Sequence, residues 1–299
     1  VFTYYLNDIP QTAKAERQDA EKALNKKNQS VPFPGWQQLA QEANESEPQM
    51  LLLVSDEQNN PVRWIKAANK KGLHRTNWDL KLPAPNPINF SQPAFKPPWV
   101  GDPQGPLVAP GNYNVSLYMA HNGQLEPQGS PQSFTLKPAD ITTTTDDFIA
   151  ATAFQAETSE LSRQVSSAGR KLSEAANRIK HMKAALLQTP QASEILFANL
   201  AKLEHELTEL RKRLNGDPVR QNLNENTTPS IRSRVGVVAY GHWRTTQKPT
   251  TTQQRNIEIA TAEFTQFKTD LAAYYTALES YEATLDAAGA PYTPGRNIQ

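Results

Sequence analysis

The second half of the chain carries apolar residues at alternating steps of three and four, and this spacing restricts the fold more than any other feature. Such a stripe occupies one side of an α-helix, as it does in coiled coils. One step is longer, and there Thr158 takes the seam position. The seam residues are Phe154, Leu161, Val165, Ala168, Leu172, Ala175, Ile179, Met182 and Leu186, then Leu196, Leu200, Leu203, Leu207, Leu210 and Leu214, and finally Ile257, Ala260, Phe264, Phe267, Leu271, Tyr274, Leu278, Tyr281 and Leu285. The pattern predicts an antiparallel, coiled-coil-like three-helix bundle within residues 141–299.

The ends of these stretches carry residues that start or stop helices. Pro190 separates the first stretch from the second, and Gly216 followed by Pro218 is typical of a helix end. Thr251–Gln254 resembles a capping box and opens the third helix. We therefore place the helices at about 146–188, 191–215 and 252–288, with a loop at 216–250.

The first half of the chain changes to short apolar runs of strand length. In Asn112–Met119 every second residue is apolar, which predicts a strand with one face in the core. His74–Leu80 is likewise expected to form a strand with Thr76, Trp78 and Leu80 on one face. The other runs are Phe2–Leu6, Met50–Val54, Pro61–Ala67 and the pair Phe134 and Leu136. Together they predict an immunoglobulin-like antiparallel β-sandwich of about seven strands over residues 1–140, with a helical insertion at about 7–48.

Proline dominates the stretch 83–110, which excludes a helix and a central strand there. We expect an extended crossover that carries Phe90, Phe95 and Trp99. These aromatic side chains either fold back as anchors onto the sandwich or form an exposed recognition surface. The first alternative is the one we expect.

The charge balance and the apolar runs exclude several classes of partner. The chain has 31 basic and 30 acidic residues, so its charge of +1 gives no footprint for nucleic acid. The longest strongly apolar run, Met50–Val54, is far too short for membrane insertion. The chain has no cysteine, and therefore no disulfide or thiolate site. It begins at Val1 within a strand pattern, so we expect it to be part of a longer protein.

No catalytic, cofactor-binding or metal-binding motif occurs in the sequence, and the five histidines are scattered. The expected loop at 216–250 contains one apolar cluster. It includes Tyr240, His242, Trp243 and Arg244, and we expect a short helix capped by Ser230 to lead into it. The cluster either plugs an open end of the bundle, which we expect, or forms a small site for a partner or a glycan.

Several segments resemble the C-terminal region of large bacterial exported proteins with sortilin-like or BNR-repeat β-propellers, often labelled glycosyl hydrolases. They are Phe2–Leu6, Gly72–Leu80, Gly105–Tyr113, Pro229–Arg232 and Gly289–Arg296. The sandwich portion also resembles the immunoglobulin-like domain of flagellar hook-capping proteins. The resemblance implies export, an upstream propeller that holds any hydrolase site, and no catalytic residue here, because the Asp boxes of BNR repeats are absent.

We therefore expect a non-catalytic accessory module that braces an upstream β-propeller or presents a surface to a partner. One alternative is a carbohydrate-binding module that uses exposed aromatic side chains such as Phe95, Trp99 or Trp243. Another is a self-assembly element, since heptad seams can recruit a second copy. Beyond the propeller, the partners expected are a glycan or a cell-surface protein.

Overall fold

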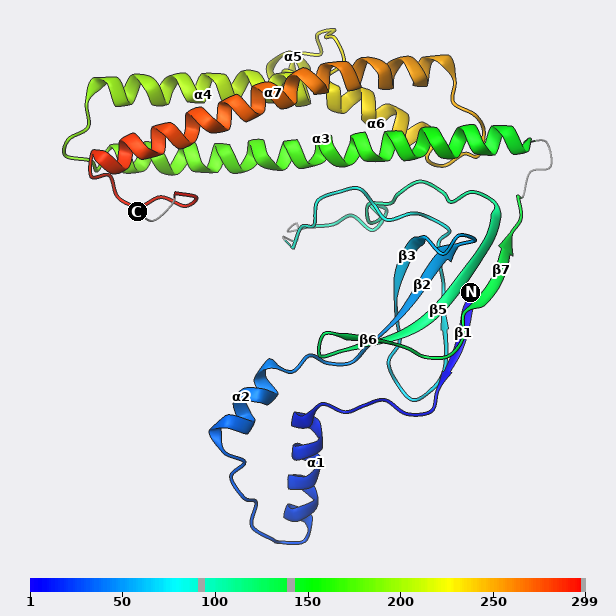
Figure 1. The fold of residues 1–299 in the computed structure, drawn as a ribbon. Helices are drawn as coiled ribbons and strands as arrows, with labels where there is room; N and C mark the ends of the chain where they lie inside the picture. Colours follow the sequence, from blue (N-terminus) through cyan, green and yellow to red (C-terminus); the bar gives the residue numbers. More distant parts are fainter. Residues whose placement is uncertain (91–94, 139–142, 297–299) are drawn as a thin grey trace. The chain divides into compact units, whose positions relative to one another are not determined.

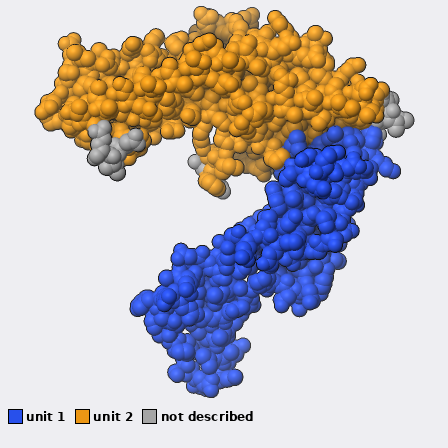
Figure 2. Space-filling model, viewed as in Figure 1, with its two compact units in different colours: residues 1–82, 108–141 blue, residues 83–107, 142–299 orange. Residues whose placement is uncertain are grey.

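The computed structural model describes residues 1–90, 95–138 and 143–296, and the fold is mixed α and β with antiparallel sheets. The chain divides into two compact units (Figures 1 and 2). Residues 1–82 and 108–141 form the β unit, and residues 83–107 and 142–299 form the helical unit. Most of the Pro-rich stretch therefore groups with the helices, whereas the sequence pattern had placed it with the strands.

Two antiparallel sheets make up the β unit. The larger sheet has the order β3-β2-β5-β6, and β7 also pairs with β5. β5 is thus central, with β2 along one edge and β6 and β7 sharing the other. Its strands are β2 (Gln49–Asp56), β3 (Pro61–Ala67), β5 (Gly111–His121), β6 (Gln124–Pro127) and β7 (Gln132–Leu136). The smaller sheet pairs β1 (Phe2–Leu6) with β4 (Gly72–Thr76).

Side chains from both sheets meet in two small core clusters. One contains Leu6 of β1 with Met50 and Leu52 of β2, and the other contains Val54, Trp78 and Tyr113. The alternate residues of β5 predicted to face the core do so: Tyr113, Val115, Leu117 and Met119.

The predicted strand at His74–Leu80 is wrong at its C-terminal end. β4 stops at Thr76, and Leu80 has a left-handed backbone with a φ of 59°. This conformation turns the chain out of the extended path, so Leu80 is exposed while Trp78 is buried. The three residues predicted to share a strand face therefore do not share one.

The helical unit has one continuous core. Its helices are α3 (Thr145–Leu186), α4 (Glu194–Asn215), α5 (Pro218–Asn222), α6 (Ile231–His242) and α7 (Thr251–Ala287). Every predicted seam residue of the three stretches lies in this core, which confirms the periodicity. Thr158 is fully buried in the seam, and its hydroxyl donates to the carbonyl oxygen of Phe154 at 2.8 Å. Arg178 of α3 and Glu282 of α7 add a buried ion pair, with 2.9 Å from Nε to Oε1.

The expected loop at 216–250 contains helices, and one of them completes the core. α4 ends at Gly216, whose φ of 95° suits only glycine, and α6 then continues along α3 and α7 (Figure 1). Ile231, Val235 and Val238 of α6 are buried in the shared core. The predicted second helix is α4, and α6 is an additional helix within the expected loop.

The insertion between β1 and β2 holds two helices, α1 (Ala13–Lys26) and α2 (Trp36–Asn44), as the sequence predicted for residues 7–48. Thr12 caps α1 by accepting a hydrogen bond from the backbone N–H of Ala15 at 3.2 Å. We call this helical hairpin the arm.

Candidate functional site

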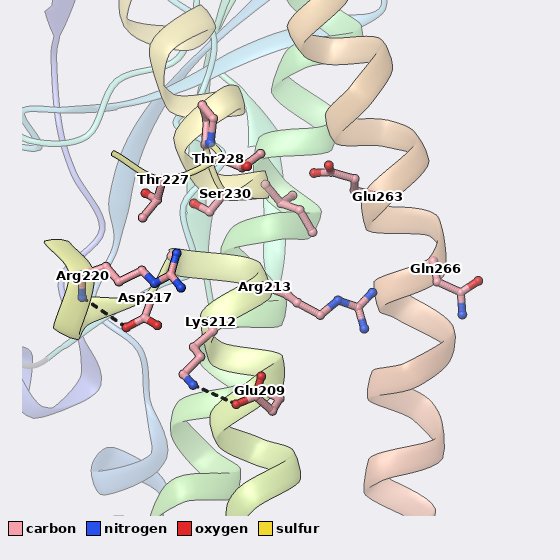
Figure 3. A pocket seen from close by; sticks show the side chains of 13 residues that line it. Glu209, Lys212, Arg213, Asp217, Arg220, Thr227, Thr228, Ser230, Glu263 and Gln266 are labelled. Carbon is pink, nitrogen blue, oxygen red and sulfur yellow. Dashed lines mark hydrogen bonds and ion pairs between the residues drawn. The ribbon is translucent and has the colours of Figure 1, made fainter. Parts of the chain in front are cut away.

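The break between α4 and α6 leaves a cavity of about 690 Å³ (Figure 3). Three local signals create it. Gly216 ends α4, the Asp217 side chain caps α5, and the Ser230 hydroxyl caps α6. The chain must leave the helix axis between these points, and α7 closes the opposite side with Glu263 and Gln266.

The charged side chains that line the cavity have partners close by. Lys212 Nζ lies 2.9 Å from Glu209 Oε1, and Arg213 Nη1 lies 2.5 Å from Asp270 Oδ2. Asp217 accepts hydrogen bonds from the first turn of α5, at 2.9 Å from the Val219 nitrogen. Figure 3 shows the Lys212–Glu209 pair and the Asp217 cap facing into the same space.

Two of these pairings move pKa values away from neutrality. The hydrogen bond from Lys212 lowers the pKa of Glu209, and the same bond raises the pKa of Lys212. Arg213 lowers the pKa of Asp270 in the same way. A general acid or base works best with a pKa near the working pH, so these groups favour fixed-charge recognition over proton transfer.

The four residues of α6 and its C-terminal turn that the sequence singled out do not form one site. Tyr240 is exposed, and the guanidinium carbon of Arg244 lies 4.7 Å from its ring centroid. His242 and Trp243 are instead buried, with exposed fractions of 1% and 9%. Two of the four therefore face solvent, and two are buried.

His242 is fixed as a core side chain. Its ring meets Phe154 edge to face at 5.1 Å, and its Nε2 lies 2.9 Å from the carbonyl oxygen of Gln247. Gln155 of α3 donates from Nε2 to the carbonyl oxygens of His242 and Thr245, at 3.0 and 2.9 Å. Burial lowers the pKa of His242, which favours the neutral ring.

The Pro-rich segment, residues 83–107, presents the two remaining candidate residues, Phe95 and Trp99, to solvent. They are 71% and 83% exposed. Trp99 sits in a tight turn in which the Val100 nitrogen donates to the Pro97 carbonyl oxygen at 3.0 Å. An ion pair of 2.6 Å from Lys96 Nζ to Asp102 Oδ1 links the two sides of this turn.

The Pro-rich segment is fastened to the helices at two points. Arg170 of α3 donates from Nη2 to Asn89 Oδ1 at 3.2 Å, and the Leu107 nitrogen donates to the Trp243 carbonyl oxygen at 3.3 Å. These contacts explain why the segment groups with the helical unit despite its distance in sequence.

Within residues 1–90, 95–138 and 143–296, no cluster of three or more His, Asp or Glu side chains is placed to bind a metal ion. Over the same ranges, no helix has both the length and the apolar composition that a bilayer-spanning segment requires. Comparisons of the chain with protein-family models, with curated proteins and with solved structures found no significant match.

Sequence reasoning missed the cavity between α4 and α6, although two of its signals were recognised. Gly216 with Pro218 was interpreted as a helix end, and Ser230 as the cap of a short helix. The three predicted seams do not include α6, the helix that follows α4 along the same side of the bundle. The apolar spacing of Ile231, Val235 and Val238, at steps of four and three, is the signal that predicts this.

Proposed function

We propose that this chain is a non-catalytic module of a larger exported protein and that its Pro-rich segment recognises a partner. One observation carries the proposal: large apolar side chains gather on this segment and face solvent, from 47% to 93% exposed. They are Ile88, Phe90, Phe95, Trp99 and Val100.

The local structure supports a role in binding rather than in folding. Exposed apolar clusters mark interaction sites, and tryptophan is enriched among the residues that dominate binding energy. Prolines and the Lys96–Asp102 ion pair restrict the turn that carries Trp99, so little conformational entropy is lost when a partner binds. The Pro-rich segment is therefore suited to hold Trp99 ready for insertion into a partner's pocket.

The proposal includes a finer description of the fold and of the partner. We interpret the β unit as an immunoglobulin-like sandwich and the helical unit as a three-helix bundle with one interrupted helix. The resemblance to regions that follow sortilin-like or BNR-repeat propellers makes such a propeller, upstream in the same protein, the partner we propose. In this role the module braces the propeller outside the cytoplasm.

The geometry gives less support to two other functions. A carbohydrate-binding module is favoured by the exposed ring of Trp99, but Trp243, the second aromatic residue expected there, is buried. Self-assembly through the heptad seams would need free seam residues, and those predicted are buried within the chain's own core. Light scattering at several protein concentrations would detect a second copy.

The test is a binding assay between this chain and the separately expressed segment immediately upstream. We expect association that Trp99→Ala weakens by about 2 kcal/mol, or about thirty-fold in Kd. Tyr292→Ala is the matched control, because Tyr292 is also an exposed aromatic residue (66%) of the helical unit. Absence of binding, or equal losses in the two variants, would refute the proposal.

A further inference from the structure

The arm folds with polar contacts and leaves its apolar side chains unused. α1 buries none of its residues. Its link to α2 is ionic, with Arg17 Nε and Nη2 each 2.8 Å from an oxygen of Glu42, whose side chain is 3% exposed. Glu45 Oε2 accepts a hydrogen bond from the Ala13 nitrogen at 2.7 Å and closes the other end of the hairpin. The fold of the arm therefore gives no reason for exposed aromatic residues on it.

Two aromatic side chains nevertheless face solvent where the two helices of the arm are joined. Phe33 is 63% exposed and Trp36 is 79% exposed, and Val31 beside them is 37% exposed. The rings of Phe33 and Trp36 touch edge to face, with centroids 5.2 Å apart and an interplanar angle of 70°. They form one apolar projection rather than scattered single residues.

Between Glu21 and Glu42 the sequence of the arm carries positive charges alone. Residues 22–41 contain Lys22, Lys26 and Lys27 and no aspartate or glutamate. Lys22 pairs with Asp19 at 2.8 Å, whereas over the described residues no ion pair forms at Lys26 or Lys27. The near-zero net charge of the whole chain therefore conceals a cationic tip.

We propose that this tip, residues 22–36 of the arm, binds the surface of an anionic lipid bilayer. Aromatic side chains favour the headgroup region of a bilayer, and lysines next to them are attracted by anionic lipids. Lys26 ends α1 and Trp36 begins α2, with Lys27 and Phe33 in the connection between them, so the same end of the hairpin carries both groups. The binding is peripheral, because the segment is too short to span the apolar layer.

The ring geometry and the charge separate a bilayer from other partners. A sugar stacks on a flat aromatic face, and two rings inclined by 70° do not form a shared platform. A protein pocket for Phe33 and Trp36 would not explain why Lys26 and Lys27 lack acidic partners on the arm. The fluid headgroup region accepts both inclined rings, and anionic headgroups supply the missing charge.

Vesicle co-sedimentation with the full chain tests this proposal. Vesicles of equal parts phosphatidylcholine and phosphatidylserine are compared with vesicles of phosphatidylcholine alone, at low and high salt. We expect sedimentation with the anionic vesicles, reduced by salt. Lys26→Gln with Lys27→Gln should lower the partition coefficient on the order of twenty-fold, because each lysine contributes about five-fold. Phe33→Ser with Trp36→Ser should lower it by about ten-fold or more.

Matched controls lie elsewhere in the same unit. Lys70→Gln with Lys71→Gln removes another adjacent pair of exposed lysines, and Tyr5→Ser with Leu73→Ser removes an exposed cross-strand pair. Both should bind like the unaltered chain, and circular dichroism verifies that all four variants fold. The proposal is overturned if the anionic vesicles bind no protein, if neutral vesicles bind equally well, or if test and control variants lose binding alike. Binding to an insoluble polysaccharide in place of vesicles would also overturn it.

Discussion

The two units of this chain are stabilised in different ways. The helical unit buries a continuous apolar seam that runs along α3, α4, α6 and α7. The β unit has two small clusters instead, and an aromatic group joins its sheets. In that group Phe2 of β1 lies 5.4 Å from Phe134 of β7, and Tyr113 lies 5.9 Å from both Phe134 and Trp78.

This difference indicates which kind of substitution should destabilise each unit most. A long seam distributes its stabilisation over many similar leucines, so one truncation removes a small share, whereas a buried charge disrupts the seam at any point. A small aromatic cluster places much of its stabilisation in a few large side chains. Each unit should therefore have its own critical substitution, and each should unfold without the other.

The largest expected effect is that of Leu207→Asp in the middle of α4. Leu207 is 4% exposed within the seam, and an unpaired buried carboxylate there should cost about 5 kcal/mol. We expect loss of most of the helical signal in far-UV circular dichroism, while the β unit still unfolds at its own midpoint. His205→Asp, on the exposed side of α4, is the control. A single shared transition in both proteins would show that the two units are not independent.

Trp78→Ala is the corresponding substitution in the β unit. Trp78 is 8% exposed and contacts Tyr113 and Phe134 edge to face, so its removal leaves a large cavity and should cost about 4 kcal/mol. The helical signal should remain, and the denaturation midpoint of the β unit should fall. Trp64→Ala is the matched control because Trp64 is 43% exposed, and its effect should be about 1 kcal/mol. Equal losses from the two substitutions would contradict the central role of the aromatic cluster.

A smaller effect concerns the start of α7, where sequence and structure differ by one residue. The capping box uses Thr250, which accepts from the Gln253 nitrogen at 3.3 Å, while Gln253 Oε1 accepts from the Thr250 nitrogen at 2.9 Å. Thr250→Ala should cost the helical unit about 1 kcal/mol, measured by urea unfolding. Thr251→Ala, at the position that the sequence had favoured, should change the free energy of unfolding by less. The reverse order would support the sequence-based assignment.

The helical unit was the more predictable from sequence because its period is encoded in many residues at once. Each seam leucine repeats the same information, so the core of α3, α4 and α7 could be predicted in full. Boundaries depend on single hydrogen bonds, and Thr250 and Thr251 offer the same hydroxyl group. The helix that begins at Ile231 has a short apolar spacing of its own, but its place beside α3 and α7 depends on packing between residues far apart in the sequence.

The β unit and the exposure of Phe95 and Trp99 were harder to predict, because they depend on single backbone conformations and contacts rather than on a repeated pattern. The left-handed backbone at Leu80 ends the extended path in a stretch whose apolar alternation continues. The exposure of Phe95 and Trp99 follows from where the Pro-rich segment is fastened, through Asn89 and Leu107, and composition does not specify those contacts. Aromatic residues between prolines are equally compatible with anchoring and with presentation until their surroundings are known.

The smallest effect that we predict is a pH dependence confined to the helical unit. Burial lowers the pKa of His242 in the folded state below its value of about 6.5 in the unfolded chain. The neutral ring is thus favoured by folding, so this contribution is fully present above that pH and is lost as the pH falls through the folded pKa. The carboxyl groups of Asp147 and Asp270, whose pKa values are lowered from 3.8, titrate at a lower pH and do not confuse this window.

The measurement is the urea midpoint of the helical unit at about pH 7.5 and about pH 5. We expect a lower midpoint at the acidic value, and we expect His242→Gln to remove most of the difference, since its amide can still donate to the Gln247 carbonyl oxygen. The midpoint of the β unit is recorded in the same sample for comparison. An unchanged pH dependence in the variant would assign the effect to groups other than His242. Such a result would also weaken the comparison between the units, because His242 is the one histidine that the seam encloses among the described residues.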